Sequence, residues 1–248
     1  MKKLLPFVAV FLFLQCHSPQ KISNSHYSIV RINKDSLKLS DEKIHKIIAP
    51  YKKSLDSIMS EVICINEQDL KKELPEGTLC NFVCDELMNY YSRIFSNNKV
   101  DFCMYNYGGL RVSTINAGEI TVGKIYELCP FENTLEAVEI DGKSCKILFD
   151  MLAQNGGLPV SSNLRMKITN NEASEIYING EAFDTNKNYT VLTNDYFANG
   201  GDKMDLLKNS AHHYPLGIKV RDALIFQLKE KGENNIRINV VKDGRISK

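Results

Sequence analysis

The 248-residue sequence contains no tryptophan and few of the residues that interrupt regular structure, with 7 prolines and 14 glycines. Long flexible linkers and collagen-like repeats are therefore excluded. A net charge is also lacking, because 31 Lys and Arg residues are balanced by 30 Asp and Glu residues. Without a basic excess there is no electrostatic footprint for phosphate backbones, so we expect no nucleic-acid partner. With 43% hydrophobic residues, the composition is typical of one large or two small globular domains.

An apolar run at the N-terminus, residues 4–14, is shorter than the ~20 residues that a membrane-spanning helix needs. It follows a basic start and is followed by Gln15 and Cys16, an order typical of a secretory signal. A Cys at this place resembles a bacterial lipoprotein signal, in which cleavage before the Cys leaves a thiol that carries a diacylglycerol. We therefore predict a signal peptide over residues 1–15, lipidation of Cys16 and a tether over residues 16–40. The alternative is an ordinary signal peptide cut elsewhere. Both predict export. The lipoprotein interpretation, which we favour, further predicts a lipid anchor in the cell envelope, on the periplasmic side or the cell surface.

Six further cysteines follow: Cys64, Cys80, Cys84, Cys103, Cys129 and Cys145. An even number in an exported protein permits disulfides. However, Cys103 and Cys129 lie within apolar runs, where Cys behaves as a small hydrophobic residue. Cys80 and Cys84 are spaced one helical turn apart, but no second pair and no suitably spaced His completes a zinc site. We expect mostly free thiols in the core.

Hydrophobic periodicity predicts interleaved helices and strands. Helices are expected over residues 44–59, 79–94, 120–128, 145–155 and 220–228. Strands are expected over residues 29–32, 62–65, 100–105, 135–140, 164–168, 175–178, 189–193 and 236–241. The segment 194–202 is expected to be a polar loop, and the pair His212-His213 a surface turn. Because no repeat or internal boundary is found, residues 41–248 are predicted to form one mixed α/β or α+β domain.

One loop, residues 106–111, follows a predicted buried strand. Its two glycines, Gly108 and Gly109, would let the backbone approach a ligand closely, and Arg111 could then reach an anion. Taken alone, a Gly pair after a strand is more often an ordinary turn.

Two further loops place an aromatic residue beside polar groups. Residues 130–133 form a Pro-fixed corner, and residues 194–202 contain a Gly-Gly pair and a carboxylate. Their candidate residues are Phe131, Asn133, Tyr196, Gly200 and Asp202. Taken separately, these could be a core Phe and a solvated turn.

Together the three loops suit a nucleoside. Two aromatic rings would sandwich a base, and stacking of a base on an aromatic side chain is worth roughly 1–3 kcal/mol. The amides of Asn106 and Asn133 would contact the edge of the base. Asp202 would accept hydrogen bonds from ribose hydroxyls, and Arg111 would meet a phosphate.

At these residues the sequence resembles the C-terminal, substrate-specificity domain of the 5′-nucleotidase family, over about residues 41–232. The matching motifs follow in order: Asn81-Phe82-Val83-Cys84-Asp85, Asn106 to Arg111 with its Gly-Gly pair, Gly118-Glu119-Ile120-Thr121, Tyr126 to Pro130-Phe131-Glu132-Asn133-Thr134, Asn179-Gly180 and Asn194 to Asn199-Gly200-Gly201-Asp202. The resemblance implies a four-layer α/β/β/α fold. It also implies that Phe131 and Tyr196 are the stacking pair, and that the loops around them bind a nucleoside or nucleotide.

The sequence departs from the family pattern where family members carry an Arg ahead of the first motif. This chain has Glu73-Leu74-Pro75 there. A lost charge-assisted contact is worth on the order of 1.5–3 kcal/mol, so we expect weaker phosphate affinity and a relative preference for nucleosides. A second departure is Asn163, where the family often has Gly.

Full-length members of the family hydrolyse nucleotides with two metal ions in a separate N-terminal domain, which carries Asp-x-His and Gly-Asn-His motifs. Neither motif occurs in this sequence. We therefore expect no catalytic residue, metal ligand or cofactor in this chain, and divalent metals only in a partner.

Four hypotheses follow from that comparison. The leading one is the specificity half of a split exported 5′-nucleotidase that acts with a separately encoded metallophosphatase. The alternatives are a stand-alone nucleoside-binding envelope lipoprotein, a structural domain with a vestigial site, and, least expected, a self-sufficient hydrolase.

Overall fold

The computed structural model describes residues 24–29, 42–95 and 99–248. The predicted signal peptide, Cys16 and residues 30–32 of the expected first strand lie outside them, and Ile29 has no regular structure. Residues from Pro50 to Lys248 form one compact unit, whereas residues up to Ala49 belong to another. None of the described helices is long and apolar enough to cross a membrane.

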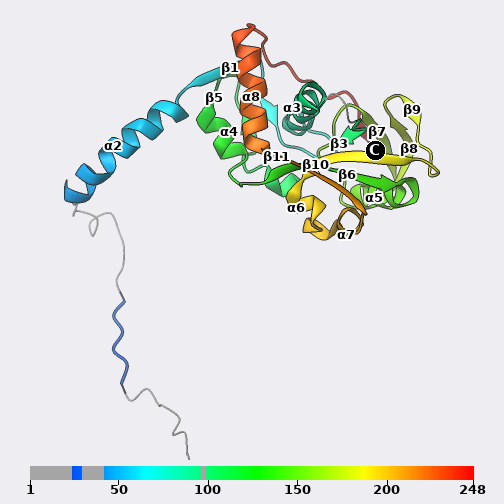
Figure 1. The fold of residues 1–248 in the computed structure, drawn as a ribbon, viewed down its shortest axis with the longest axis horizontal. Coiled ribbons are helices and arrows are strands. Elements are labelled where there is room, and N and C mark those ends of the chain that lie inside the picture. Colours follow the sequence, from blue (N-terminus) through cyan, green and yellow to red (C-terminus); the bar gives the residue numbers. More distant parts are fainter. Residues whose placement is uncertain (1–23, 30–41, 96–98) are drawn as a thin grey trace, which may run out of the picture. The chain divides into compact units, whose positions relative to one another are not determined.

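Helices and strands alternate along the chain (Figure 1). The helices are α2 Glu42–Met59, α3 Thr78–Ile94, α4 Val122–Leu128, α5 Gly142–Gln154, α6 Asp195–Ala198, α7 Asp205–Lys208 and α8 Val220–Glu233, with short 3₁₀ turns at Tyr107–Gly109 and Gly201–Lys203. The strands are β1 Val62–Asn66, β2 Leu70–Lys71, β3 Phe102–Cys103, β4 Thr114–Ile115, β5 Gly118–Thr121, β6 Thr134–Asp141, β7 Leu164–Thr169, β8 Glu172–Ile178, β9 Glu181–Ala182, β10 Asn188–Asn194, β11 His212–Lys219 and β12 Ile246–Ser247.

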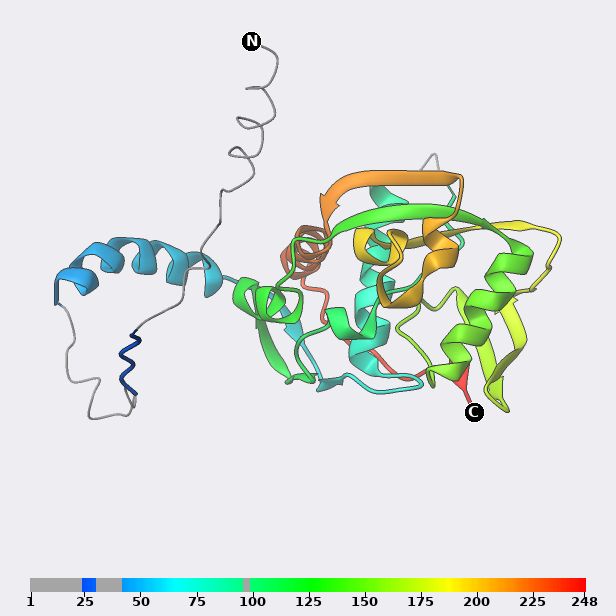
Figure 2. The same cartoon turned by 90° about the horizontal axis from the view of Figure 1, so that it is seen from below.

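The main sheet has the strand order β11-β6-β10-β3 and a second sheet the order β12-β7-β8-β9. In the main sheet β6 is antiparallel to both neighbours, while β3 is parallel to β10. Side chains of β6 alternate between two hydrophobic cores: Leu135 and Ala137 join one, and Val138 and Ile140 the other. The first core holds α3, α4 and α8, and the second holds α5, α6, α7 and the second sheet, so helices cover both faces (Figures 1 and 2). The predicted mixed α/β fold is confirmed.

Helix α2 carries an apolar stripe that the described structure leaves exposed. Its residues are Ile44, Ile47, Ile48, Tyr51, Leu55 and Ile58, and all are at least 49% exposed. They recur at helical spacing, as the sequence predicts. The helix itself is confirmed, and it continues through Pro50.

Most predicted elements are confirmed, but three predictions are wrong. The segment 194–202 is not a plain loop, because the Asn194 side chain accepts a hydrogen bond from the Phe197 amide and caps α6. Residues 236–241 form no strand beyond a single bridge between Ile238 and Asn66. The pair His212-His213 forms the start of strand β11 and is not a surface turn. His213 Nδ1 lies 2.5 Å from Glu136 Oε1.

Two predicted elements have different bounds. The strand expected over residues 100–105 is reduced to β3. In the segment 120–128, Ile120 belongs to β5, and α4 begins only at Val122.

All six cysteines of the described part are free and buried, as predicted. Burial raises the pKa of the Cys80 thiol to about 12, and burial likewise raises the pKa of Cys129 to about 12. These thiols therefore stay protonated and pack as apolar groups.

A buried group of polar residues, which we call the tail network, connects α3 to the C-terminal segment. The buried guanidinium of Arg245 donates to both carboxylate oxygens of Asp85, each at 2.9 Å, and to Asp243 Oδ1 at 3.0 Å. Glu76 accepts from the Asn81 side chain at 2.7 Å and from the Asp243 amide at 2.8 Å. Asn81 and Asp85, the polar ends of the first family-like motif, thus hold the tail next to α3 and let β12 pair with β7.

Candidate functional site

Strand register brings the three candidate loops together at one edge of the main sheet. Strand β6 begins at Thr134, directly after the 130–133 corner, and its Leu135 pairs with Asn194 at the end of the antiparallel β10. Strand β3 runs parallel to β10, so the 106–111 loop leaves the sheet at the same edge. Three segments that are far apart in sequence therefore share one place because of this sheet order.

A cavity of about 590 Å³ lies between these loops, and we call it the ring cavity. Its lining residues are Asn106, Gly108, Arg111, Phe131, Glu132, Asn133, Asp195, Tyr196 and Asp202. Seven of the nine residues predicted from the sequence are among them. The other two, Gly109 and Gly200, do not line it.

The two aromatic rings are left largely outside the core. Phe131 is 48% exposed and Tyr196 is 42% exposed, whereas neighbouring Phe197 is fully buried. The Tyr196 ring packs against Gly201, where a Cβ would come within 2.5 Å of the ring. Large exposed rings whose position is fixed by their surroundings offer flat apolar surface to a ligand.

Asp202 joins the second ring to the polar side of the cavity. The Tyr196 hydroxyl donates to Asp202 Oδ1 at 2.8 Å, and this hydrogen bond raises the pKa of Tyr196. Asp202 has a left-handed backbone, with φ 52° and ψ 34°, a conformation that costs a non-glycine residue free energy. The carboxylate keeps lone pairs that can accept further hydrogen bonds.

Within residues 42–95 and 99–248, each of the two amides of the cavity is hydrogen-bonded through one end only. Asn106 Oδ1 accepts from the Asn194 side chain at 2.8 Å, and Asn133 Nδ2 donates to Asp195 Oδ1 at 2.7 Å. The NH₂ group of Asn106 and the carbonyl oxygen of Asn133 therefore remain for a ligand. Together they provide one donor and one acceptor.

Arg111 supplies the positive charge of the cavity. Its guanidinium carbon lies 5.7 Å from the centre of the Phe131 ring, within cation–π range. Its Nη1 donates to the Gly108 carbonyl at 3.3 Å. The guanidinium thus lies near one aromatic ring with other N–H groups left for an anion.

Lys72 holds the 106–111 loop, and the sequence analysis missed it. Its ammonium donates to the Leu110 carbonyl at 2.8 Å and lies 4.0 Å from the centre of the Tyr107 ring. Burial lowers the pKa of Lys72, and the charge of Arg111 lowers it further. Lys72 therefore places a second cation against the 106–111 loop. No pattern in the sequence signals this role.

The corner that carries Phe131 is fastened to the start of α8, and no pattern in the sequence signals this contact. Buried Arg221 donates to Glu132 Oε1 at 2.6 Å and to the Pro130 carbonyl at 3.4 Å, and Glu132 also pairs with Lys219. The Val220 amide donates to the Asn133 carbonyl at 2.9 Å. Hydrogen bonds from Arg221 and Lys219 lower the pKa of Glu132 to about 2.

The predicted glycines act in different ways. A Cβ at Gly109 would come within 2.5 Å of Asn106 Oδ1, so this glycine lets the amide sit against the backbone. Gly200 has a left-handed φ of +89° and forms the turn after α6. A Cβ at Gly108 would meet nothing within 4 Å, so the backbone there borders open space.

Outside the cavity lies Glu73, where the resemblance leads us to expect an Arg. Its carboxylate pairs with Lys242 at 2.5 Å, and the hydrogen bond from Lys242 lowers the pKa of Glu73. Among the residues that the structure describes, no group of three or more His, Cys, Asp and Glu side chains could hold a metal ion. The ring cavity itself offers stacking surface, hydrogen-bonding groups and a guanidinium.

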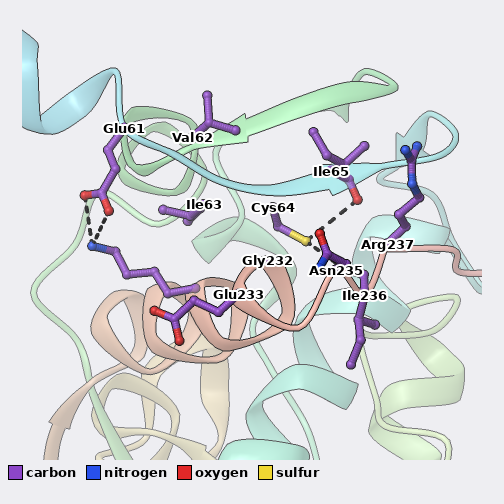
Figure 3. A pocket seen from close by; sticks show the side chains of 11 residues that line it. Glu61, Val62, Ile63, Cys64, Ile65, Gly232, Glu233, Asn235, Ile236 and Arg237 are labelled. Carbon is purple, nitrogen blue, oxygen red and sulfur yellow. Dashed lines mark hydrogen bonds and ion pairs between the residues drawn. The ribbon is translucent and has the colours of Figure 1, made fainter.

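Another cavity, of about 530 Å³, lies between β1 and the end of α8 (Figure 3). There Glu61 pairs with Lys229 at 2.7 Å, and the Cys64 thiol donates to the Ile236 carbonyl at 3.4 Å. Gly232 brings α8 against the strand, because a Cβ there would lie 2.2 Å from the Ile63 carbonyl oxygen. This place holds the helix on the strand.

Comparison with known proteins identifies similar chains. The sequence profile of the family described as 5′-nucleotidase, C-terminal domain, matches residues 59–209, more than half of the chain. A 5′-nucleotidase of Diplobatis ommata is 28% identical over 180 residues, which cover 62% of this chain and 31% of that protein. The trifunctional nucleotide phosphoesterase YfkN of Bacillus subtilis is 26% identical over 79% of this chain and 14% of its own length.

Among solved structures, the 5′-nucleotidase precursor of Thermus thermophilus matches with a TM-score of 0.69 and 26% identity. The match covers 84% of this chain and 43% of that one. It confirms the fold that the resemblance implied. This chain spans less than half the length of each of these three relatives.

Proposed function

The chain belongs to the 5′-nucleotidase C-terminal domain family, and on that premise we propose that its ring cavity binds nucleosides and nucleotides. The observation that carries this proposal is the meeting of two exposed rings, two half-bonded amides, a carboxylate and a guanidinium around one cavity. A base stacks on Phe131 and Tyr196, Asp202 accepts from the ribose, and Arg111 faces the 5′ side.

Base selection comes from the two amides. The NH₂ group of Asn106 donates to a ring nitrogen, and the carbonyl oxygen of Asn133 accepts from an exocyclic amino group. A base with an amino group beside an acceptor nitrogen, such as adenine, satisfies both. Uracil has a carbonyl oxygen where adenine has the amino group, and an N–H where adenine has the acceptor nitrogen. Uracil therefore binds more weakly.

The 5′-phosphate contributes less than the base. Arg111 is the cation that lines the cavity, with Lys72 behind it, while Glu73 replaces the Arg expected from the resemblance. Nucleosides are therefore bound nearly as well as nucleotides.

We assign hydrolysis to a partner. The sequence contains neither the Asp-x-His nor the Gly-Asn-His motif that the resemblance associates with the metal-binding domain of the family. It acts as the specificity half of a split exported 5′-nucleotidase, with a separately encoded metallophosphatase that supplies the divalent metals. Lipidation of Cys16 holds it at the cell envelope.

A stand-alone nucleoside-binding envelope lipoprotein is the second candidate. One observation favours it: the ring cavity of this chain already offers a stacking surface, amides, a carboxylate and a guanidinium, which together suit every part of a nucleoside.

Calorimetric titration of the mature protein with adenosine, AMP and uridine in a chelator tests the binding proposal. Adenosine is expected to bind tighter than uridine, and the Phe131→Ala/Tyr196→Ala variant to bind neither. Tyr177→Ala is the matched control, because Tyr177 is 45% exposed on β8 and lines no part of the cavity. Normal binding by the double variant would refute the ring site.

The split enzyme is tested by adding a metallophosphatase encoded beside this chain and measuring phosphate release from AMP with Mn²⁺. Activity that rises on mixing, and falls with the double variant, supports the partner. Unchanged activity on mixing leaves the binding lipoprotein as the function.

A further inference from the structure

A cavity of about 530 Å³ adjoins the ring cavity. It is separate from the one between β1 and α8, and we call it the second cavity. Gly108 and Asp202 line both cavities and so form the boundary between them. On this boundary Gly108 has no side chain, and a Cβ there would meet no heavy atom within 4 Å. A ligand can therefore continue from one cavity into the other.

The second cavity has an apolar base and a polar rim. Leu74, Met151 and Leu158 contribute apolar surface, while Gln154 and Asn155 at the end of α5 add two amides. Both cavities fall within the size range of small-ligand sites, and their volumes of about 530 and 590 Å³ are nearly equal. Two similar cavities in contact fit two linked units of similar size.

Lys203 gives the second cavity a cation. Lys203 lines this cavity and not the ring cavity. In the described part of the chain, no carboxylate forms an ion pair with its ammonium within 4.0 Å. Asp202 and Lys203 both have positive φ, 52° and 68°. A non-glycine residue pays free energy for this conformation, and among the residues described there is one other such pair, Asn170 and Asn171, in the turn between β7 and β8. Here the strained pair puts a carboxylate on the boundary and an ammonium just beyond it.

Resting on the proposed function, we propose that the second cavity binds the 3′-linked half of a dinucleoside monophosphate whose first nucleoside occupies the ring cavity. Asp202 accepts from the ribose of the first nucleoside, so its 2′ and 3′ oxygens lie at the boundary. A phosphodiester on the 3′ oxygen then meets Lys203. The second nucleoside lies against Leu74 and Met151, with Gln154 beside its base.

The 5′ side of the first nucleoside points elsewhere, toward Arg111, which does not line the second cavity. The two extensions of a nucleoside are therefore read by different cations. Lys203 governs the 3′ extension and Arg111 governs the 5′-phosphate.

The test compares the affinities of adenosine, 5′-AMP, 3′-AMP and adenylyl-(3′→5′)-adenosine for the mature protein, by calorimetry in a chelator. We expect the dinucleoside monophosphate to bind roughly ten- to hundredfold tighter than adenosine, as one charge-assisted contact allows, and tighter than 3′-AMP. Lys203→Ala removes most of this gain. Gln154→Trp, which fills the second cavity from its exposed rim, removes it as well. Both keep the affinities for adenosine and 5′-AMP, and Lys167→Ala on β7 is the control for loss of an exposed lysine.

Each other outcome decides against the proposal. Equal affinity for adenosine and the dinucleoside monophosphate, or a gain that survives both variants, overturns the second cavity as its site. Equal affinity for 3′-AMP overturns the contact with a second nucleoside. Failure of adenosine itself to bind contradicts the proposed function, and the dinucleoside site falls with it.

Discussion

The ring cavity and the tail network contain similar residues but differ in how those residues are bonded. In the tail network, Arg245 is buried and its donors are bound by Asp85, Asp243 and the Val160 carbonyl. In the ring cavity, Phe131 and Tyr196 are exposed, and Asn106 and Asn133 each use one end only. In the tail network the donors and acceptors bind one another, whereas in the ring cavity some donors and acceptors remain for a ligand.

This contrast separates residues that the family-like motifs do not distinguish. Asn81 and Asp85 form one motif with the same residue types as Asn106 and Asp202. The first pair holds the chain together, because its partners lie within the protein. The second pair lines a cavity. Function is thus indicated by unused donors and acceptors, and not by residue type.

The largest effect is expected from Arg245→Ala. Removing the cation takes from the partly buried carboxylates of Asp85 and Asp243 the guanidinium that bonds both of them, and leaves Asp85 with the Ser162 amide and Asp243 with Arg165 at 3.3 Å. Breaking a buried ion pair in this way costs about 3–5 kcal/mol of unfolding free energy. Urea denaturation followed by circular dichroism measures the loss.

In that variant, the molecules that remain folded should bind adenosine with unchanged affinity, because the tail network lines no part of the ring cavity. A stable Arg245→Ala protein, or a folded one with a lost adenosine site, would show that the two regions are not separate as described.

Next in size are the single substitutions Phe131→Ala and Tyr196→Ala. Each removes one stacking surface and is expected to weaken adenosine binding by roughly 1–3 kcal/mol. Phe131→Ala should have little effect on stability because its ring is exposed, whereas Tyr196→Ala also loses the hydrogen bond to Asp202 and should be less stable. Calorimetry gives the affinity and thermal unfolding gives the stability. If only one of the two substitutions weakens adenosine binding, the base stacks on that ring alone.

The sequence predicts the helices and the long strands well, because their hydrophobic periodicity is strong. It fails at 194–202 and 236–241. In the first segment, the cap from Asn194 overrides the loop signals of its glycines. In the second, the apolar run meets the end of β1 and pairs with it through a single bridge, between Ile238 and Asn66. Local patterns cannot show whether a run finds a strand to pair with.

Of the site, the resemblance and the loop composition predict the residues that line the ring cavity, but not those that hold them. Arg221 and Lys72 lie 90 and 39 positions in sequence from Phe131 and Arg111, at places that only the folded sheet brings close. Charged residues of this kind are common in any sequence. Their role depends on distances that periodicity does not encode.

A smaller effect is expected from Tyr196→Phe, which keeps the ring and removes the hydrogen bond to Asp202. The lost bond should lower the unfolding free energy by about 0.5–1.5 kcal/mol, while stacking is retained. Adenosine affinity should stay close to that of the unchanged protein. A loss as large as that of Tyr196→Ala would show that the hydroxyl, and not the ring, binds the ligand.

The smallest effect concerns pH and Glu132, which borders the ring cavity but is bonded like a residue of the tail network. Bonds from Arg221 and Lys219 hold its pKa at about 2, below the ordinary value of about 4.5. A carboxyl group with a lowered pKa stabilises the fold above its unfolded pKa, and the contribution is lost as the pH falls from about 4.5 through 2.

Glu132→Gln should therefore be slightly less stable than the unchanged protein at pH 7, and the difference should vanish near pH 2. Because the Glu132 side chain is 63% exposed, salt should also reduce the difference. Urea unfolding at pH 7, 4 and 2 measures it, with Glu172→Gln, at an exposed place on β8, as the matched control. A difference that stays constant with pH would mean that the Arg221 pair does not stabilise the corner that carries Phe131.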